Sequence, residues 1–217
     1  MKTNTQLPYL GRLDKERLAV FDKLSAFANE FVLAGGTALM LRIGHRLSYD
    51  FDCFSEDELS KTLLRKAKRI FGRGIFPRVQ TPEQLTFTTP ENVEVTFVYH
   101  PYPPLANPLK TSSIPVFHPD DLAANKTYTI GRRGVWRDYV DLFILLKWDL
   151  YSIFQLIELA EKKFSGEFHD KLFLEQLSYF DDVEIIPVNF LKESYSPQEI
   201  QSYLKGQVEN YLRKVLG

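Results

Sequence analysis

The chain has 217 residues, of which 44% are hydrophobic and 25% are charged, a composition typical of a folded globular protein and not of a disordered one. Its 27 basic and 28 acidic side chains give a formal net charge of -1, which excludes attraction of the whole chain to nucleic acid, so that a polyanionic substrate would have to meet a local basic cluster. The single cysteine, Cys53, excludes an intrachain disulfide and a cysteine-based metal site.

The N-terminal residues lack the apolar core of a signal peptide, and no stretch has the roughly 18 uncharged apolar residues of a membrane helix. We therefore expect a soluble, cytoplasmic protein without membrane contact. The four histidines are too scattered for a zinc site.

The first predicted elements alternate between helix and strand. Residues 14–30 have apolar side chains at helical spacing, with Asp14 as the cap. The apolar run 31–34 predicts a buried strand that stops at Gly35-Gly36-Thr37, and residues 38–43 favour a short helix.

Residues 48–54 alternate strictly and predict a strand with a core face and an acidic face. Tyr49, Phe51 and Cys53 fall on the first face, and Ser48, Asp50 and Asp52 on the second. Cys53 is accordingly expected to be a core residue and not a nucleophile.

The remaining elements of the first half are a helix and several strands. Ser55 and Glu58 resemble a capping box for a helix to about Ile70. Strands are predicted over 76–79, 85–88 and 93–99, a loop with four prolines over 100–113, and one last short strand over 114–117.

From Pro119 onward the patterns are helical, with predicted helices over 120–126, 137–148, 152–164, 169–180 and 197–216. The sequence therefore predicts an α+β protein in which a mixed sheet with flanking helices (domain 1–118) precedes a helical domain (119–217).

Two aspartates at i and i+2 on a strand point the same way, so the carboxylates of Asp50 and Asp52 can converge on one or two hard cations. Magnesium suits such a pair, because it binds one or two carboxylates and completes its shell with water and phosphate oxygens. A solvent-facing strand edge remains the alternative.

The glycine turn lies between a buried strand and a helix. Without side chains at Gly35 and Gly36, a phosphate can approach the backbone N–H groups and the positive end of the helix. A tight turn that requires positive φ is the alternative.

The order of strand, GG[ST], short helix and second strand with DxD resembles the DNA polymerase β-like nucleotidyltransferase superfamily. The chain resembles the AbiEii nucleotidyltransferase family more closely, through GGTALMLRIGHRLSYDFDCFS followed by Lys126 and WRDYVDLFILL. Members of that family are toxins of toxin–antitoxin and phage abortive-infection systems. The resemblance covers residues 14 to about 165. GGTAL and RxSxDFD are its specific blocks, and the later blocks are looser.

The resemblance implies roles for the glycine turn and the acidic strand. Gly36 and Thr37 correspond to residues that contact the nucleotide phosphates, with Gly35 beside them. Asp50 and Asp52 correspond to the metal ligands.

Further roles follow from the later blocks. Arg46 and Ser48 would orient phosphate or the acidic strand, and Lys126 would touch the triphosphate. The RDxxD block places Asp138 near the active site. A third metal-binding carboxylate would be Glu94, although Thr96 could stand there instead.

Basic residues cluster after the acidic strand at Lys126, Arg132 and Arg133, which could bind phosphate or could simply be a solvated helix end. Asp138 could pair with Lys126 or Arg46. Stabilisation of the helix dipole would explain Asp141.

The family resemblance implies transfer of a nucleoside monophosphate from a nucleoside triphosphate (NTP), with one or two Mg²⁺ ions, to an RNA hydroxyl, with the 3′ end of tRNA as one option, or to a protein hydroxyl. It also implies a cognate antitoxin as a partner. A haloacid dehalogenase-like phosphatase is a poor rival, because the residues before Asp50 are not an apolar strand. A nucleotide- or partner-binding module without turnover is the remaining alternative.

Overall fold

The computed structural model describes residues 7–216, which fall into two compact units, one up to Pro119 and the other from Asp120 onward. The predicted domains also included residues 1–6 and 217, which lie outside the described range. Among the described residues, no helix is long and apolar enough to cross a membrane.

The first unit contains a mixed five-stranded sheet in the order β1-β2-β5-β4-β3. Its strands are β1 (Val32–Ala34), β2 (Phe51–Ser55), β3 (Pro77–Gln80), β4 (Gln84–Thr88) and β5 (Glu94–Tyr99). β2 and β5 are parallel and the other neighbours are antiparallel. This sheet confirms the predicted α+β class.

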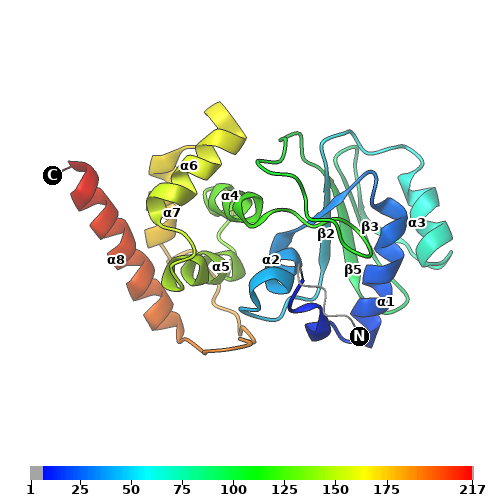
Figure 1. Ribbon diagram of the computed structural model, residues 1–217, viewed down its shortest axis with the longest axis horizontal. Helices are drawn as coiled ribbons and strands as arrows, with labels where there is room; N and C mark the ends of the chain where they lie inside the picture. Colours follow the sequence, from blue (N-terminus) through cyan, green and yellow to red (C-terminus); the bar gives the residue numbers. More distant parts are fainter. Residues whose placement is uncertain (1–6, 217) are drawn as a thin grey trace. The chain divides into compact units, whose positions relative to one another are not determined.

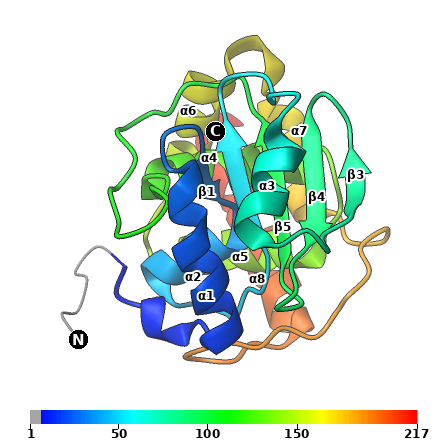
Figure 2. The same ribbon diagram turned by 90° about the vertical axis from the view of Figure 1, so that its right-hand side faces the viewer.

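Helices cover both faces of the sheet (Figures 1 and 2). They are α1 (Lys15–Lys23), α2 (Gly35–Ile43) and α3 (Leu63–Phe71), with the 3₁₀ segments η1 (Leu10–Arg12) and η2 (Leu24–Phe27). α1, η2 and α3 lie on one face, where aromatic rings from the helices pack on rings from the strands, namely Phe21 on Phe51, Phe27 on Phe97 and Phe71 on Phe87. α2 lies on the opposite face.

The first predicted helix is correct in place but too long. Asp14 caps α1 by accepting a hydrogen bond from the amide of Arg17. The α-helix ends at Lys23 and continues as the 3₁₀ turn η2, in which i and i+3 side chains align. Leu24 and Phe27 are thereby both fully buried, an arrangement that apolar spacing alone does not distinguish from an α-helix.

The acidic strand begins later than predicted. β2 starts at Phe51, so Asp52 lies on the strand and Asp50 immediately precedes it. Phe51 and Cys53 are fully buried, as expected, whereas Tyr49 is exposed. The strict alternation therefore holds only within β2.

The helix predicted from Ser55 is wrong at its start. Ser55 is the last residue of β2, and its hydroxyl accepts the amide hydrogen of Asp57, two residues on. This is the local turn that serine forms in competition with a helix cap. α3 begins only at Leu63, where Leu63, Ala67 and Phe71 supply a buried stripe.

Residues 114–117, predicted as a strand, form isolated bridges of Val116 with Leu33 and Leu109. The proline-rich loop before them is confirmed.

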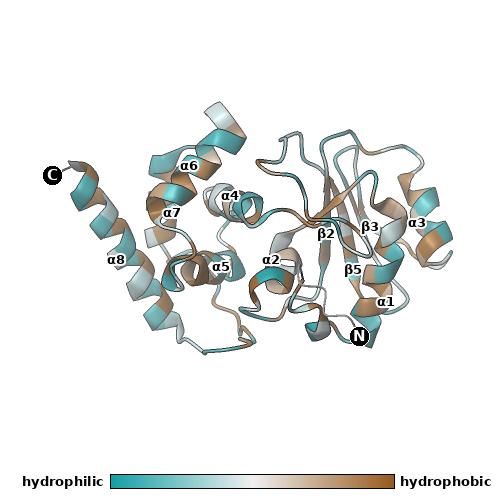
Figure 3. Cartoon of the chain, viewed as in Figure 1, coloured by the Kyte–Doolittle hydropathy of each residue, from teal (hydrophilic) through white to brown (hydrophobic). Residues whose placement is uncertain are grey.

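The second unit is helical, as predicted. It contains α4 (Pro119–Ile130), α5 (Trp136–Lys147), α6 (Ile153–Phe164), η3 (Ser165–Glu167), α7 (Asp170–Ser178) and α8 (Pro197–Leu216). α6 begins with a capping box between Ser152 and Gln155. Hydrophilic and hydrophobic residues alternate along α8 (Figure 3), which buries Ile200, Leu204 and Val208 at successive turns.

Candidate active site

The glycine turn follows β1 directly and forms the start of α2. Gly35 has a φ of +67°, in the left-handed region that favours glycine. No side chain caps the start of α2, although the first N–H groups of a helix lack partners within it. The turn therefore presents amide donors and a positive helix end, which together favour an anion.

The carboxylate of Asp52 lies against this turn. Ala34 and Asp52 are paired in the antiparallel register of β1 and β2. A Cβ atom built on Gly35 would lie 2.1 Å from Oδ2 of Asp52, so only glycine leaves room for the carboxylate. The acidic strand and the glycine turn are thus in direct contact within the first unit.

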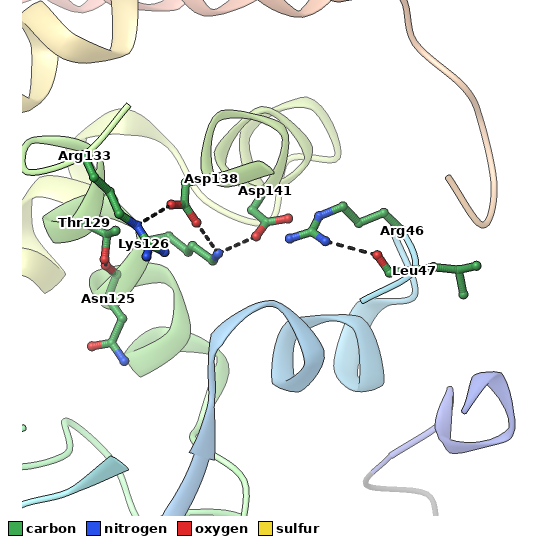
Figure 4. Close-up of polar contacts among 8 residues, drawn as sticks. All are labelled: Arg46, Leu47, Asn125, Lys126, Thr129, Arg133, Asp138 and Asp141. Carbon is green, nitrogen blue, oxygen red and sulfur yellow. Dashed lines mark hydrogen bonds and ion pairs between the residues drawn. The ribbon is translucent and has the colours of Figure 1, made fainter. Parts of the chain in front are cut away.

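A cation and a hydroxyl gather at the second glycine. A Cβ atom on Gly36 would lie 2.8 Å from Nη2 of Arg46 and 2.9 Å from Oγ of Ser48. The Arg46 guanidinium is held in place by donating from Nη1 to the carbonyl of Leu47 at 3.1 Å (Figure 4). Two groups that can bind phosphate oxygens therefore lie beside the start of α2.

Thr37 contacts the backbone before β2, whereas Gly35 and Gly36 lie against side chains. Its buried hydroxyl donates to the backbone carbonyl of Asp50 at 2.5 Å. On the other side of the same segment, Nε of Arg17 donates to the carbonyl of Tyr49 at 3.1 Å. These bonds fix the backbone that carries Asp50, and contact of Thr37 with phosphate stays a prediction.

The two aspartates fit a magnesium site by their chemistry. Both are half-buried, and no hydrogen bond or ion pair to the Asp50 side chain is present among residues 7–216. Asp52 shares its sheet face with Thr96, its partner in register on β5. Two carboxylates beside a turn that presents amide donors match the ligand set that magnesium accepts, in which phosphate and water complete the shell.

Glu94 is not brought together with this pair. Its carboxylate forms an ion pair with Arg78, and the described residues contain no group of three or more His, Cys, Asp or Glu that could hold a metal. A role of Glu94 as third ligand stays a prediction. Cys53, next to Asp52, is fully buried, and burial, with the charge of Asp52, raises the pKa of its thiol well above its ordinary value. It is a core residue.

In the second unit, Lys126 lies at the centre of a buried ionic network (Figure 4). Its ammonium is 2.5 Å from Oδ1 of Asp138 and 2.6 Å from Oδ2 of Asp141, and Nε of Arg133 is 3.0 Å from Oδ2 of Asp138. The side chains of both aspartates are at most 2% exposed. The network fixes the position of Lys126, and the predicted pairing of Asp138 with Lys126 is confirmed.

The sequence-based interpretation of Asp141 was incomplete. The helix dipole does not fully explain this residue, because Asp141 is completely buried and paired with Lys126. Asp138 and Asp141 are three residues apart on α5 and therefore share a face. That spacing, combined with the prediction that Lys126 is functional, was the available signal.

The chain is similar to known proteins over most of its length. Residues 18–213 match the family described as nucleotidyl transferase AbiEii toxin, of type IV toxin–antitoxin systems. An uncharacterized protein of Aquifex aeolicus is 29% identical over 213 residues, covering 94% of this chain and 99% of its own length.

Two solved structures share the fold. MenT4, a nucleotidyltransferase toxin of Mycobacterium tuberculosis, has a TM-score of 0.59 at 14% identity and covers 94% of this chain and 84% of its own. JHP933 of Helicobacter pylori has a TM-score of 0.56 at 19% identity and covers 92% and 91%.

Proposed function

The chain belongs to the AbiEii nucleotidyltransferase toxin family, and we propose that it transfers a nucleoside monophosphate from an NTP to a hydroxyl group of RNA. The acceptor oxygen forms a bond to the α-phosphorus, the bond to the pyrophosphate oxygen breaks, and the acceptor proton passes to water. The observation that carries the proposal is the contact of the Asp52 carboxylate with Gly35 at the start of α2.

The phosphates of the NTP would bind at the start of α2. The amides of Gly35 and Gly36, the Arg46 guanidinium and the Ser48 hydroxyl supply donors from two directions. Arginine suits planar contact with phosphate oxygens. Because these groups are fixed by the fold, they would stabilise developing negative charge without reorganising during the reaction.

Asp50 and Asp52 would bind one or two magnesium ions. Bound there, magnesium would neutralise charge on the phosphates and lower the pKa of the attacking hydroxyl. The hydrogen bond from Thr37 to the Asp50 carbonyl supports this assignment, because it fixes one ligand relative to the helix that binds phosphate.

Lys126 would contact the triphosphate, and Asp138 and Asp141 would act as positioning residues for it. A lysine held between two buried carboxylates has its ammonium fixed in position. The family description, a toxin of type IV toxin–antitoxin systems, supports an antitoxin protein as partner.

Labelled NTP tests the reaction directly. Purified protein with magnesium and tRNA is expected to incorporate label from α-³²P-NTP into RNA and to release label from γ-³²P-NTP as pyrophosphate. Incorporation of label into protein would show that the acceptor is a protein and not RNA. Release of inorganic phosphate from simple phosphomonoesters, without incorporation of label, would indicate a phosphatase. NTP binding without turnover would indicate a nucleotide-binding module that has no catalytic activity.

Gly35→Ala is expected to lower transfer at least about 100-fold, because a 1 Å displacement of a catalytic group can cost this much. The new Cβ atom would overlap Oδ2 of Asp52, and alanine is strained at a φ of +67°. The rate is measured under single-turnover conditions. Gly11→Ala is the matched control, because a Cβ atom there meets nothing within 4 Å. Equal activity of both variants would contradict the role of the close approach.

Asp138→Asn is expected to lower transfer about 10-fold through looser positioning of Lys126. Lys126 would keep Asp141 but lose the charge of its second partner. Arg133→Gln removes only the exposed member of the network, whose side chain is 60% exposed, and should have a smaller effect. Unchanged turnover and KM for NTP in Asp138→Asn would remove this residue from the site.

A further inference from the structure

One face of α3 carries a concentration of cations. Arg65 is three residues from Lys68 and four from Arg69 on α3, which places these three on the same side of the helix. Lys61 and Arg73 flank the helix just before its start and after its end, and they line the same groove. The opposite side, with Leu63, Ala67 and Phe71, is buried in the core. We call these five residues the basic face of α3.

The basic face lines a groove of about 960 Å³ that extends to Gln80 at the end of β3. The lining residues include five cations and no acid. Whereas the chain as a whole has a net charge of -1, this surface therefore has a strongly positive local potential.

Within residues 7–216, the cations of this face lack the acidic partners that neighbouring basic residues have. Neighbouring basic residues are neutralised, for example Lys66 by Glu30 and Arg78 by Glu94. In the described part of the chain, Lys61, Arg65 and Arg69 have no ion pair. Unpaired like charges on adjacent turns repel one another, so this arrangement costs stability unless an anion binds there.

An aromatic side chain stands next to these cations. Phe76 is 73% exposed, and the ammonium of Lys68 lies 5.6 Å from the centre of its ring. Exposed aromatic rings among basic residues are typical of surfaces that bind single-stranded nucleic acid, because unpaired bases stack on them.

We propose that the basic face of α3, with Phe76, binds the phosphate backbone and an unpaired base of the RNA acceptor. This inference rests on the proposed function for its choice of RNA among polyanions. The groove is distinct from the candidate active site, because Phe51 and Cys53 of β2 point toward the side of the sheet that α3 covers and Asp52 points to the other.

The position of the groove sets a requirement on the RNA. β3 is the edge strand and lies three strands from β2, a distance of about 14 Å at the usual strand spacing. An RNA whose end reaches Asp52 must pass around this edge to touch α3. A long acceptor such as tRNA can do so, but a trinucleotide cannot.

Binding can be measured independently of catalysis by fluorescence anisotropy of fluorescein-labelled tRNA with the full chain, without NTP or metal. Arg65→Glu/Arg69→Glu is expected to raise the Kd at least about 10-fold, because contacts with phosphates are lost. The slope of log K against log salt should also become shallower, by about 0.7 to 0.9 for each lost contact. Phe76→Ala is expected to weaken binding by a smaller factor with the salt dependence unchanged. Circular dichroism checks that each variant is folded.

Lys171→Glu/Arg213→Glu is the matched control, because it makes the same change in net charge at side chains that are 87% and 74% exposed. An equal loss of tRNA binding in this control would overturn the proposal, as would equal affinity of the wild type for duplex DNA or tighter binding to phosphatidylserine vesicles. Transfer to a trinucleotide acceptor should be the same in wild type and Arg65→Glu/Arg69→Glu, and an equal loss with both acceptors would also overturn it.

The two proposals fail separately. If tRNA binding depends on the basic face but the wild type transfers no nucleotide, the proposed reaction fails and the RNA surface stands. If the wild type labels tRNA and Arg65→Glu/Arg69→Glu binds it normally, the RNA surface fails and the proposed reaction stands.

Discussion

Asp52→Asn is expected to reduce nucleotidyl transfer by at least about 10³-fold, because it removes a charged metal ligand from the point where charge develops in the reaction. The side chain is close to isosteric, so it should still fit against Gly35, where the carboxylate now lies within the space of a missing Cβ atom. Loss of activity would then report the charge and not the packing. Single-turnover rates at saturating NTP and magnesium are the measurement.

Magnesium binding provides a second measurement for this variant. Magnesium with NTP should raise the melting temperature of the wild type, since a ligand that binds only the folded state stabilises it, and should have little effect on Asp52→Asn. Asp57→Asn is a control with the same change of charge at an exposed residue just after β2. A fully active Asp52→Asn variant would refute the assignment of the metal site.

The contact between the acidic strand and the glycine turn could be predicted because its determinants are local. Alternation identified the buried face of β2, and two adjacent glycines after an apolar run marked the turn. What the sequence could not give was the register that pairs Ala34 with Asp52. Register depends on the partner strand, and a shift by one residue would turn Asp52 to the other face.

Errors arose where one local pattern has two structural outcomes. Ser55 and Glu58 have the spacing of a capping box, yet the Ser55 hydroxyl accepts the amide of Asp57 in a turn. Both arrangements satisfy the same hydroxyl, and the choice depends on where a buried stripe begins. That stripe begins at Leu63, so tertiary packing decided the start of α3.

Ion pairs of the basic residues are likewise not predictable from local sequence. The sequence indicates a basic cluster at Lys126, Arg132 and Arg133, but each of these has an acidic partner within 4 Å, with Arg132 paired to Glu167. The cations of α3 are equally apparent in the sequence. Their lack of partners becomes visible only once ion pairs between distant segments are known.

A buried ion pair between α4 and α6 leads to the largest expected change in stability. The ammonium of Lys163 lies 2.6 Å from Oδ1 of Asp121, and both side chains are completely buried. Lys163→Met is expected to lower the free energy of unfolding by about 3–5 kcal/mol, because it leaves a buried carboxylate without its counter-charge. Urea unfolding followed by tryptophan fluorescence is a suitable measurement, since both tryptophans, Trp136 and Trp148, are in this unit.

The double variant Asp121→Val/Lys163→Met separates the charge from the packing. Replacing a whole buried ion pair by apolar residues of similar volume is often neutral or even stabilising, since desolvation of both charges opposes their attraction. The double variant should therefore be more stable than Lys163→Met. If it is equally destabilised, packing around Lys163 and not its charge accounts for the loss. An effect of Lys163→Met below about 1 kcal/mol would show that other groups compensate the Asp121 carboxylate.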